Sequence, residues 1–248
     1  MSESGATLAT PKLYLLDVEG TVAPLTLTSE LLFPYARTHL PDFLRQNLAR
    51  PEVQADLRLL AEENRAEESQ LSPTYGIEIR NELHARAYLM WLMDQDRKST
   101  ALKSLQGKIW RSGFESGELK GTLFDDVPAA FERWSQNQSQ PARIAIYSSG
   151  STEAQQLLFR HSTHGDLTPL IAAYFDTRTG AKAEPASYAA IAQAMQVAPA
   201  DVLFLSDIVR ELDAAREAGC QTGLVVREGN PPLADAHDHI AVESFAAL

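Results

Sequence analysis

Cysteine, long apolar runs and positive charge are all scarce in this 248-residue sequence. The single cysteine, Cys220, cannot form a disulfide within the chain, which is typical of a protein from a reducing compartment. No apolar run reaches the roughly 20 residues needed to span a membrane, and residues 1–12 lack the apolar stretch of a signal peptide. These absences predict a cytoplasmic protein with no membrane partner.

Negative charge prevails in the sequence. The 33 Asp and Glu residues outnumber the 22 Lys and Arg residues, so the formal net charge is −11 at pH 7. This excess argues against a nucleic-acid partner, and an anionic small molecule would need a local cation to hold it. The hydrophobic fraction of 44% is that of an ordinary globular protein, and the chain is long enough to bury a core.

The most informative pattern is a run of four apolar residues, 13–16, followed by Asp17, Glu19 and Gly20. A short run of this kind predicts a buried strand of a parallel sheet. Residues i and i+2 of an extended segment point the same way, so Asp17 and Glu19 are expected to face one site at the carboxyl edge of the sheet. Taken alone, an Asp after a strand more often caps a turn.

Residues 25–123 have the spacing of helices and contain no convincing strand. Ile79, Leu83, Ala87 and Met90 recur at helical spacing and predict one buried stripe. The helices expected in this region span residues 29–48, 52–68, 77–96 and 100–114.

From about residue 124 onward, helices and strands alternate. The expected strands span residues 143–147, 202–205 and 223–226, and the expected helices 153–161, 184–195 and 209–218. Such alternation is typical of a parallel sheet covered by helices. The sequence therefore predicts an α/β core formed by residues 1–24 and 124–248, interrupted by a helical insertion at 25–123.

Two further candidate sites lie in residues 124–248, each in a loop just ahead of an expected helix. One contains two serines and the other contains a lysine. Ser148 and Ser149 follow the expected strand 143–147 and precede a helix, where hydroxyl and free backbone N–H groups can cradle a phosphate. Lys182 lies in a glycine-containing loop just ahead of a helix. Most lysines in such loops are solvated, but an acidic protein needs a cation to hold a phosphate.

Asp207 comes just after the apolar run 202–205 and is a further candidate site residue. An acid at this point is a reasonable helix N-cap. Together with Asp17 and the Glu19 carbonyl, it would also supply the oxygen ligands that Mg²⁺ prefers.

The order of these groups, an acid pair followed by serine, lysine and a second acid, resembles the haloacid-dehalogenase-like phosphotransferase superfamily. The similarity to the enolase-phosphatases (acireductone synthases) of methionine salvage is closer and covers nearly the whole chain, including the helical insertion. Val22 and Ala23 depart from that family, which usually has threonines there, and their effect on substrate preference stays open. The similar stretches are 17–21, 32–37, 91–98, 105–110, 147–151, 158–162, 165–166, 175–177, 180–188 and 204–207.

This resemblance implies a haloacid-dehalogenase-like parallel-sheet core with an inserted helical cap, in a monomer that acts on a small phosphate ester. The implied reaction converts 2,3-diketo-5-methylthiopentyl 1-phosphate to a dihydroxy-keto-methylthiopentene, the acireductone, plus phosphate. Enolisation comes first, and hydrolysis through an aspartyl-phosphate follows. The implied site comprises the nucleophile Asp17, the acid and base Glu19, the phosphate-binding Ser148, Ser149 and Lys182, and one Mg²⁺ per subunit on Asp17, Glu19 and Asp207.

Several alternatives stay open at this point. The chain could be a phosphatase of the same core for another small phosphorylated metabolite. A signalling receiver module also carries Asp, Ser or Thr and Lys at strand ends, but it lacks a helical domain between its acceptor and its serine. More than a hundred residues separate Asp17 from Ser148, which disfavours that class. Glu19 or a cap residue is expected to remove the carbon-bound proton, and the cap residues that bind the methylthio tail are not identified.

Overall fold

The computed structural model describes residues 9–137, 140–232 and 237–248. It consists of two compact units. The core unit contains the chain up to Leu27 together with Lys120–Leu248, and the cap unit is Thr28–Leu119. No helix in the described ranges is long and apolar enough to cross a membrane.

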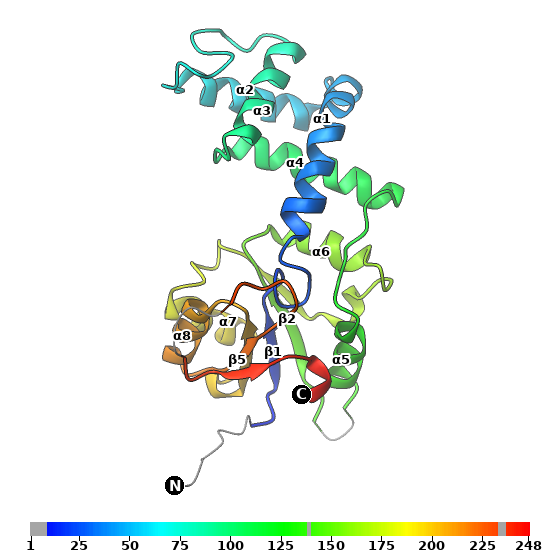
Figure 1. Cartoon of the computed structure of the whole chain (residues 1–248), viewed down its shortest axis with the longest axis vertical. Coiled ribbons are helices and arrows are strands. Elements are labelled where there is room, and N and C mark those ends of the chain that lie inside the picture. The colour runs from blue at the N-terminus through cyan, green and yellow to red at the C-terminus, as the bar shows by residue number, and fades with distance from the viewer. Residues whose placement is uncertain (1–8, 138–139, 233–236) are drawn as a thin grey trace. The chain divides into compact units, whose positions relative to one another are not determined.

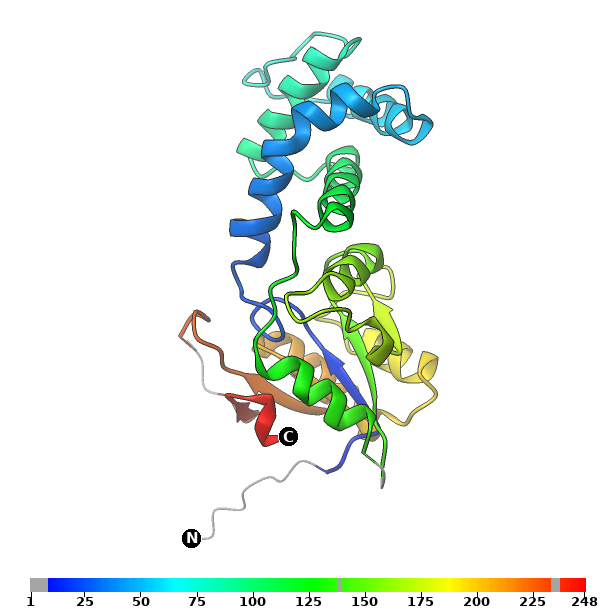
Figure 2. The same ribbon diagram turned by 90° about the vertical axis from the view of Figure 1, so that its right-hand side faces the viewer.

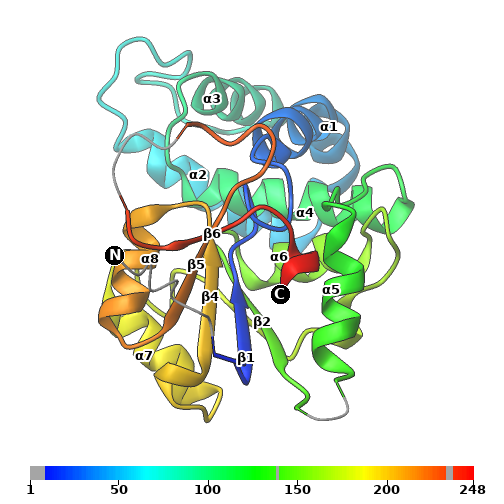
Figure 3. The same cartoon turned by 60° about the horizontal axis from the view of Figure 1, so that its bottom comes forward.

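The core unit contains one parallel sheet with the strand order β3-β2-β1-β4-β5-β6 (Figure 3). The first strand lies in the middle, paired with β2 on one side and β4 on the other. The chain therefore extends the sheet outward from β1 in both directions, and such a switch point leaves a ligand crevice at the carboxyl ends of the strands. The strands are β1 (Leu13–Leu16), β2 (Arg143–Tyr147), β3 (Ala173–Phe175), β4 (Val202–Ser206), β5 (Gln221–Val225) and β6 (Ile240–Val242).

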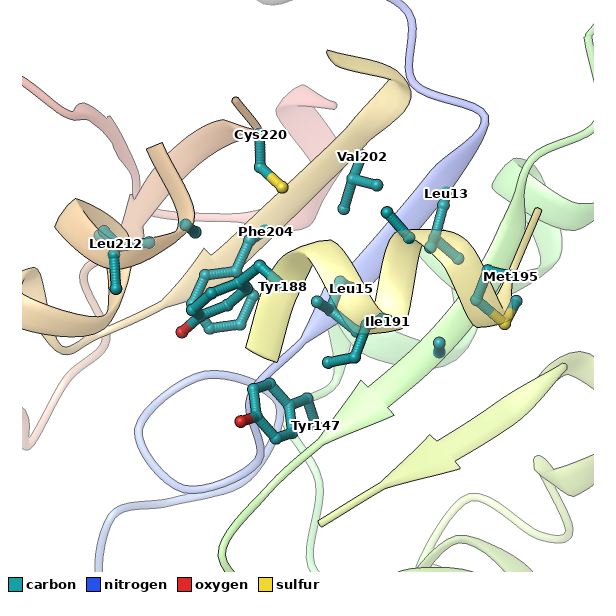
Figure 4. Close-up of a cluster of buried hydrophobic side chains, with 14 of the residues drawn as sticks. Leu13, Leu15, Tyr147, Tyr188, Ile191, Met195, Val202, Phe204, Leu212 and Cys220 are labelled. Atoms are coloured by element: carbon teal, nitrogen blue, oxygen red, sulfur yellow. The ribbon is translucent and has the colours of Figure 1, made fainter. Parts of the chain in front are cut away.

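Helices cover both faces of this sheet, which explains why β1 is apolar at every position. Leu13 and Leu15 belong to a buried cluster formed with α7 (Pro185–Ala194) and α8 (Val209–Glu217) (Figure 4). Tyr14 points to the opposite face, where its ring stacks on Trp134 of α5 with centroids 3.8 Å apart. In Figure 2, α5 lies against the blue strand β1. Strands buried on both faces appear as continuous apolar runs rather than alternating ones.

The remaining core helices are short. The α-helices are α5 (Asp126–Ser135) and α6 (Thr152–Arg160), and single 3₁₀ turns occur at Thr168–Leu170, Pro199–Asp201 and Phe245–Ala247. The expected strand 143–147 is confirmed to the residue, and the expected strands 202–205 and 223–226 correspond to β4 and β5.

The cap unit is built from four helices around one apolar cluster, and its described residues contain no strand (Figure 1). A π-helical segment, Leu27–Leu32, precedes the first of them. Within the cluster, Lys108 and Asp56 form a largely buried ion pair with a 2.7 Å N–O distance. The helices are α1 (Phe33–Asn47), α2 (Pro51–Arg65), α3 (Glu82–Asp94) and α4 (Thr100–Ser116).

The predicted buried stripe of the third cap helix is wrong at one of its four positions. Helix α3 begins five residues later than expected because Asn81 caps it, accepting a hydrogen bond from the His84 N–H. Leu83 is 61% exposed in the first turn, whereas Ile79 and Met90 pack partly buried against the cap cluster. The helix is apolar on more than one side, so spacing alone does not select its most buried face. The fully buried residues are Ala85, Tyr88, Leu89 and Leu92.

Candidate active site

Three charged side chains lie buried at the carboxyl ends of the strands. Asp17 follows β1 and Asp207 follows β4, its neighbour, and the Asp17 N–H donates to the Leu205 carbonyl at 3.0 Å. Asp17, Lys182 and Asp207 are 7%, 8% and 9% exposed. Burying a charged side chain is costly unless a partner compensates its charge. Three buried charged side chains in one place therefore indicate a functional site.

Lys182 is the cation of this site. Its Nζ lies 2.6 Å from Asp17 Oδ1 and 2.6 Å from Glu211 Oε2. Ser206 Oγ, at the end of β4, donates to the same oxygen of Glu211 at 3.1 Å. Burial by itself would lower the pKa of Lys182, but the two carboxylates outweigh it and raise this pKa above its usual value. The ammonium group therefore stays charged at neutral pH.

Hydrogen bonds from buried hydroxyl groups of the core hold the loop that carries Lys182. Tyr147 and Tyr188 belong to the buried cluster of Figure 4, and burial raises the pKa of both phenols, so their hydroxyl protons stay in place. Three consecutive loop carbonyls each accept a hydrogen bond from a core hydroxyl: Gly180 from Tyr147 (2.9 Å), Ala181 from Ser187 (2.7 Å) and Lys182 from Tyr188 (2.6 Å). The backbone of this loop is therefore rigid.

The carboxylate of Asp207 forms no ion pair among the described residues. Its buried Oδ1 has no hydrogen-bond partner among the described residues. Burial and then the charge of Asp17 raise the pKa of Asp207 to about 7. Gly20 packs directly against this carboxylate, because a Cβ at that position would lie 2.3 Å from Asp207 Oδ2, and its φ of +71° also favours glycine.

A buried carboxylate oxygen without a hydrogen-bond partner, next to a second carboxylate, is typical of a cation-binding site. The oxygen atoms of Asp17 and Asp207 suit a hard divalent ion such as Mg²⁺. Across the described parts of the chain, no three His, Cys, Asp or Glu side chains gather into a metal-binding group.

Glu19 lies half-buried in the loop after β1. That loop is tightly folded, because the Val18 carbonyl accepts hydrogen bonds from the N–H groups of residues 21–23 at 3.2, 2.9 and 2.9 Å. Val22 and Ala23, the two departures from the family pattern, are completely buried. Their apolar side chains therefore contribute to packing beneath the loop rather than to its exposed side.

Ser148 and Ser149 follow β2, the other neighbour of β1, and lie at the same edge of the sheet. Ser148 is half-buried and its N–H donates to the Phe175 carbonyl at 3.2 Å, while Ser149 is exposed. The structure thus brings Asp17 and Lys182 into direct contact and places the two serines at the same sheet edge.

The start of α6 offers fewer free donors than the sequence predicts. The Ala154 N–H donates to the Ser151 side chain at 3.2 Å, and the Thr152 N–H donates to Asp176 at 3.3 Å. Ser151 therefore caps this helix, and the carboxylate of Asp176 accepts a hydrogen bond from one of its first N–H groups.

Sequence reasoning misses Glu211 and the three hydroxyls that hold the Lys182 loop. Glu211 had a usable signal, since it follows Asp207 by one helical turn and lies in the first turn of α8. The hydroxyls of Tyr147 and Tyr188 had none, because they lie within apolar runs that look like ordinary core.

Comparison with known proteins assigns the family. A family model described as haloacid dehalogenase-like hydrolase matches residues 11–219. The chain is 52% identical to enolase-phosphatase E1 of Synechococcus elongatus over 94% of this chain and 96% of that protein. It is 44% identical to enolase-phosphatase E1 of Pseudomonas fluorescens, over 96% of each. The crystal structure of the UTR4 protein of Saccharomyces cerevisiae is similar with a TM-score of 0.78 and 34% identity, covering 96% of this chain and all of that one. The chain belongs to the enolase-phosphatase E1 family of haloacid dehalogenase-like hydrolases.

Proposed function

We propose that this chain is a magnesium-dependent enolase-phosphatase, an acireductone synthase of methionine salvage. It converts 2,3-diketo-5-methylthiopentyl 1-phosphate to the dihydroxy-keto-methylthiopentene and phosphate. The observation that carries this proposal is the buried contact between Lys182 and Asp17 at the switch point of the sheet. The substrate follows from the name of relatives that match over nearly their whole length. We further propose that the protein acts in the cytoplasm as a monomer with one Mg²⁺ per subunit.

Asp17 is the nucleophile in this proposal. One carboxylate oxygen attacks phosphorus, the bond from phosphorus to the enol oxygen breaks, and an aspartyl-phosphate forms. The main obstacle is repulsion between two anions, so positioning and charge neutralisation dominate phosphoryl transfer. Lys182 supports this role, because its ammonium group lies 2.6 Å from Asp17 Oδ1 and offsets part of the negative charge.

Glu19 is the acid and base. It donates a proton to the departing enol oxygen, and then it accepts a proton from the water that hydrolyses the aspartyl-phosphate. Its place two residues after Asp17, half-buried in the loop, supports this assignment. Lys182 and the hydroxyls of Ser148 and Ser149 hold the remaining phosphate oxygens. Glu19 or a cap residue removes the carbon-bound proton during enolisation.

Asp17, the Glu19 carbonyl and Asp207 would hold the magnesium ion. When bound, the ion neutralises charge on the phosphate and on the two carboxylates. The unpartnered Oδ1 of Asp207 supports the assignment, since a divalent cation would give this buried oxygen the partner that it lacks among the described residues. The same residues fit no soft metal, because they offer only oxygen.

Phosphate release from the diketone phosphate, compared with a panel of sugar and short-chain phosphates, tests the proposal. We expect Mg²⁺-dependent release with strong preference for the diketone phosphate, and no release in excess chelator. Asp17→Asn should abolish release in a folded protein, because an amide cannot attack phosphorus. Asp125→Asn is the control, since that side chain is fully exposed.

Two outcomes would contradict parts of this proposal. Turnover of Asp17→Asn within about tenfold of wild type, roughly 1.4 kcal/mol in barrier height, rules out Asp17 as the nucleophile. A clear preference for a sugar phosphate instead assigns the enzyme to another small phosphorylated metabolite while leaving the chemistry at Asp17 intact.

A further inference from the structure

A segment near the C-terminal end of the chain contacts the loop that follows Asp17. Asn230 Nδ2 donates to the Gly20 carbonyl at 3.0 Å, and Arg227 Nε donates to the Thr21 carbonyl at 3.1 Å. Both donors lie more than 200 residues away from their acceptors in the sequence. The segment follows β5 and thus starts at the carboxyl edge of the sheet.

These two bonds complete the hydrogen bonding of the loop carbonyls. The Val22 carbonyl accepts from the Phe124 N–H at 3.0 Å, and the Ala23 carbonyl accepts from the Gly20 N–H at 2.8 Å. Every carbonyl of residues 20–23 therefore has a donor, and only the first two depend on side chains. Removing either side chain leaves a peptide group of this loop without its partner.

Arg227 is itself held in one place. Its Nη1 lies 2.8 Å from Asp126 Oδ2, and its guanidinium lies over the rings of Phe124 and Phe245 with distances of 4.5 and 4.6 Å to their centroids. Only 7% of the side chain is exposed. Ser244 Oγ also donates to Asp126 Oδ2, at 2.9 Å. The donor to Thr21 is therefore preorganised by ion pairing and stacking.

Each of the two side chains also has one buried polar atom without a partner among the described residues, Nη2 of Arg227 and Oδ1 of Asn230. Besides Gly20, the Asn230 amide donates to the Val225 carbonyl at 3.4 Å. A buried acceptor without a partner costs stability. A side chain kept here at such a cost indicates a need for its donor at Gly20.

We propose that Asn230 and Arg227 are positioning residues for phosphoryl transfer. They hold the peptide groups of Gly20 and Thr21, and through them Glu19, which shares a peptide plane with Gly20, and Asp17. This inference rests on the proposed function. Displacement of reacting groups by about 1 Å can cost on the order of a hundredfold in rate, so backbone support of this kind affects turnover more than substrate binding.

The experiment compares Asn230→Ala with Ser244→Ala in the full-length protein. Ser244→Ala is the matched control, because it removes two hydrogen bonds of the Ser244 hydroxyl, one to Asp126 and one from the Ala246 N–H, and leaves the loop carbonyls bonded. For Asn230→Ala we expect kcat to fall about 10- to 100-fold, as for supporting residues around other reaction centres, with KM within about twofold. Hydrogen exchange of the loop peptide 17–24 should accelerate. For Ser244→Ala we expect wild-type kcat and unchanged exchange.

Arg227→Lys gives an independent test. A lysine can keep the ion pair with Asp126, but it cannot also donate to the Thr21 carbonyl, because it has no fork of donors. It should therefore lower kcat with KM within about twofold, and the loss of guanidinium stacking on Phe124 and Phe245 should also lower the thermal midpoint. If Asn230→Ala does not fold, this variant decides the matter alone.

Wild-type kcat in a folded Asn230→Ala protein overturns the inference, as does an equal loss of kcat in Ser244→Ala. A fall in thermal midpoint with unchanged kcat also overturns it, since that is what a purely structural role produces. Asp17→Asn, measured in parallel, distinguishes failure of the positioning role from failure of the proposed function. If that variant is inactive and Asn230→Ala is normal, only the positioning role fails, whereas activity of Asp17→Asn refutes the proposed function itself.

Discussion

Replacing Asp207 by asparagine should make the metal-free protein more stable. The carboxyl group is buried, its Oδ1 has no partner, and burial together with the charge of Asp17 raises its pKa from 3.8 to about 7. The ionised group is therefore a cost to the folded state whenever no cation is bound. Asparagine has nearly the same shape and cannot ionise.

The magnitude follows from linkage between the pKa and stability. Because the folded pKa lies above the unfolded value, the folded state binds this proton more tightly, and stability falls as the pH rises from about 4 through about 7. Three pKa units at roughly 1.36 kcal/mol each give about 4 kcal/mol as the upper limit at pH 8. Allowing for the altered hydrogen bonding of an amide, we expect Asp207→Asn to gain about 1–4 kcal/mol at pH 8 and less than half of that gain at pH 5.

Equilibrium unfolding in urea with excess chelator, at pH 8 and at pH 5, measures this gain. The control is Asp125→Asn, whose fully exposed side chain should change stability by no more than about 0.5 kcal/mol at either pH. Added Mg²⁺ should stabilise the wild type by mass action and the variant much less.

Two results would refute this reasoning. If Asp207→Asn is no more stable than the wild type at pH 8 in chelator, the buried charge is not a cost to folding. If its gain is the same at pH 5 and pH 8, the gain does not come from ionisation. Loss of phosphate release in the variant does not bear on either point.

Three more substitutions have expected outcomes. Lys182→Met leaves the buried carboxylates of Asp17 and Glu211 without the ammonium group that pairs with both, so we expect a loss of about 3–5 kcal/mol in chelator at pH 8, measured by urea unfolding. We expect a smaller loss at pH 6, because burial raises the pKa of Glu211, which takes up protons as the pH falls. Gly20→Ala should weaken Mg²⁺ binding, measured by calorimetry, because its Cβ would displace the Asp207 carboxylate; unchanged affinity would show that the carboxylate is free to move. Glu19→Gln should slow phosphate release far more than it raises KM, because the proton is needed only as the leaving oxygen develops charge; wild-type release would leave Glu19 no proton-transfer role. In the last variant, new ultraviolet absorbance without free phosphate would assign the enolisation base to another group.

The centre of the fold was predictable because its sequence signals are local. Residues 13–16 are buried on both faces of the sheet, so they form an unbroken apolar run, and Asp17 marks its end. The same is true of β2 and β4. By contrast, β3 and β6 are three-residue edge strands with partly exposed residues, and the spacing of apolar residues cannot assign such short segments to strands.

The charged residues of the site could be predicted from the sequence, but the hydroxyl groups that hold their backbone could not. Lys182 could be chosen because an acidic site needs a cation, although nothing in its loop distinguishes it from a surface lysine. The partners that hold its backbone are hydroxyls on Tyr147 and Tyr188, which lie in helix or strand segments that pack as core. Which hydroxyl meets which carbonyl depends on tertiary structure, and spacing along the chain does not encode it.

The central position of β1 has a consequence for how the chain folds during synthesis. Its four apolar residues are synthesised before those of the other strands, yet its partner β2 begins at Arg143 and its partner β4 at Val202. At a synthesis rate of about 5–20 residues per second, the strand that carries the nucleophile waits roughly 10–40 seconds for its second neighbour. All four cap helices are complete within that interval. The central pairings of the core sheet therefore form late in synthesis, around the strand that is made before the others. Until then, the fully apolar strand β1 must not pair with another chain.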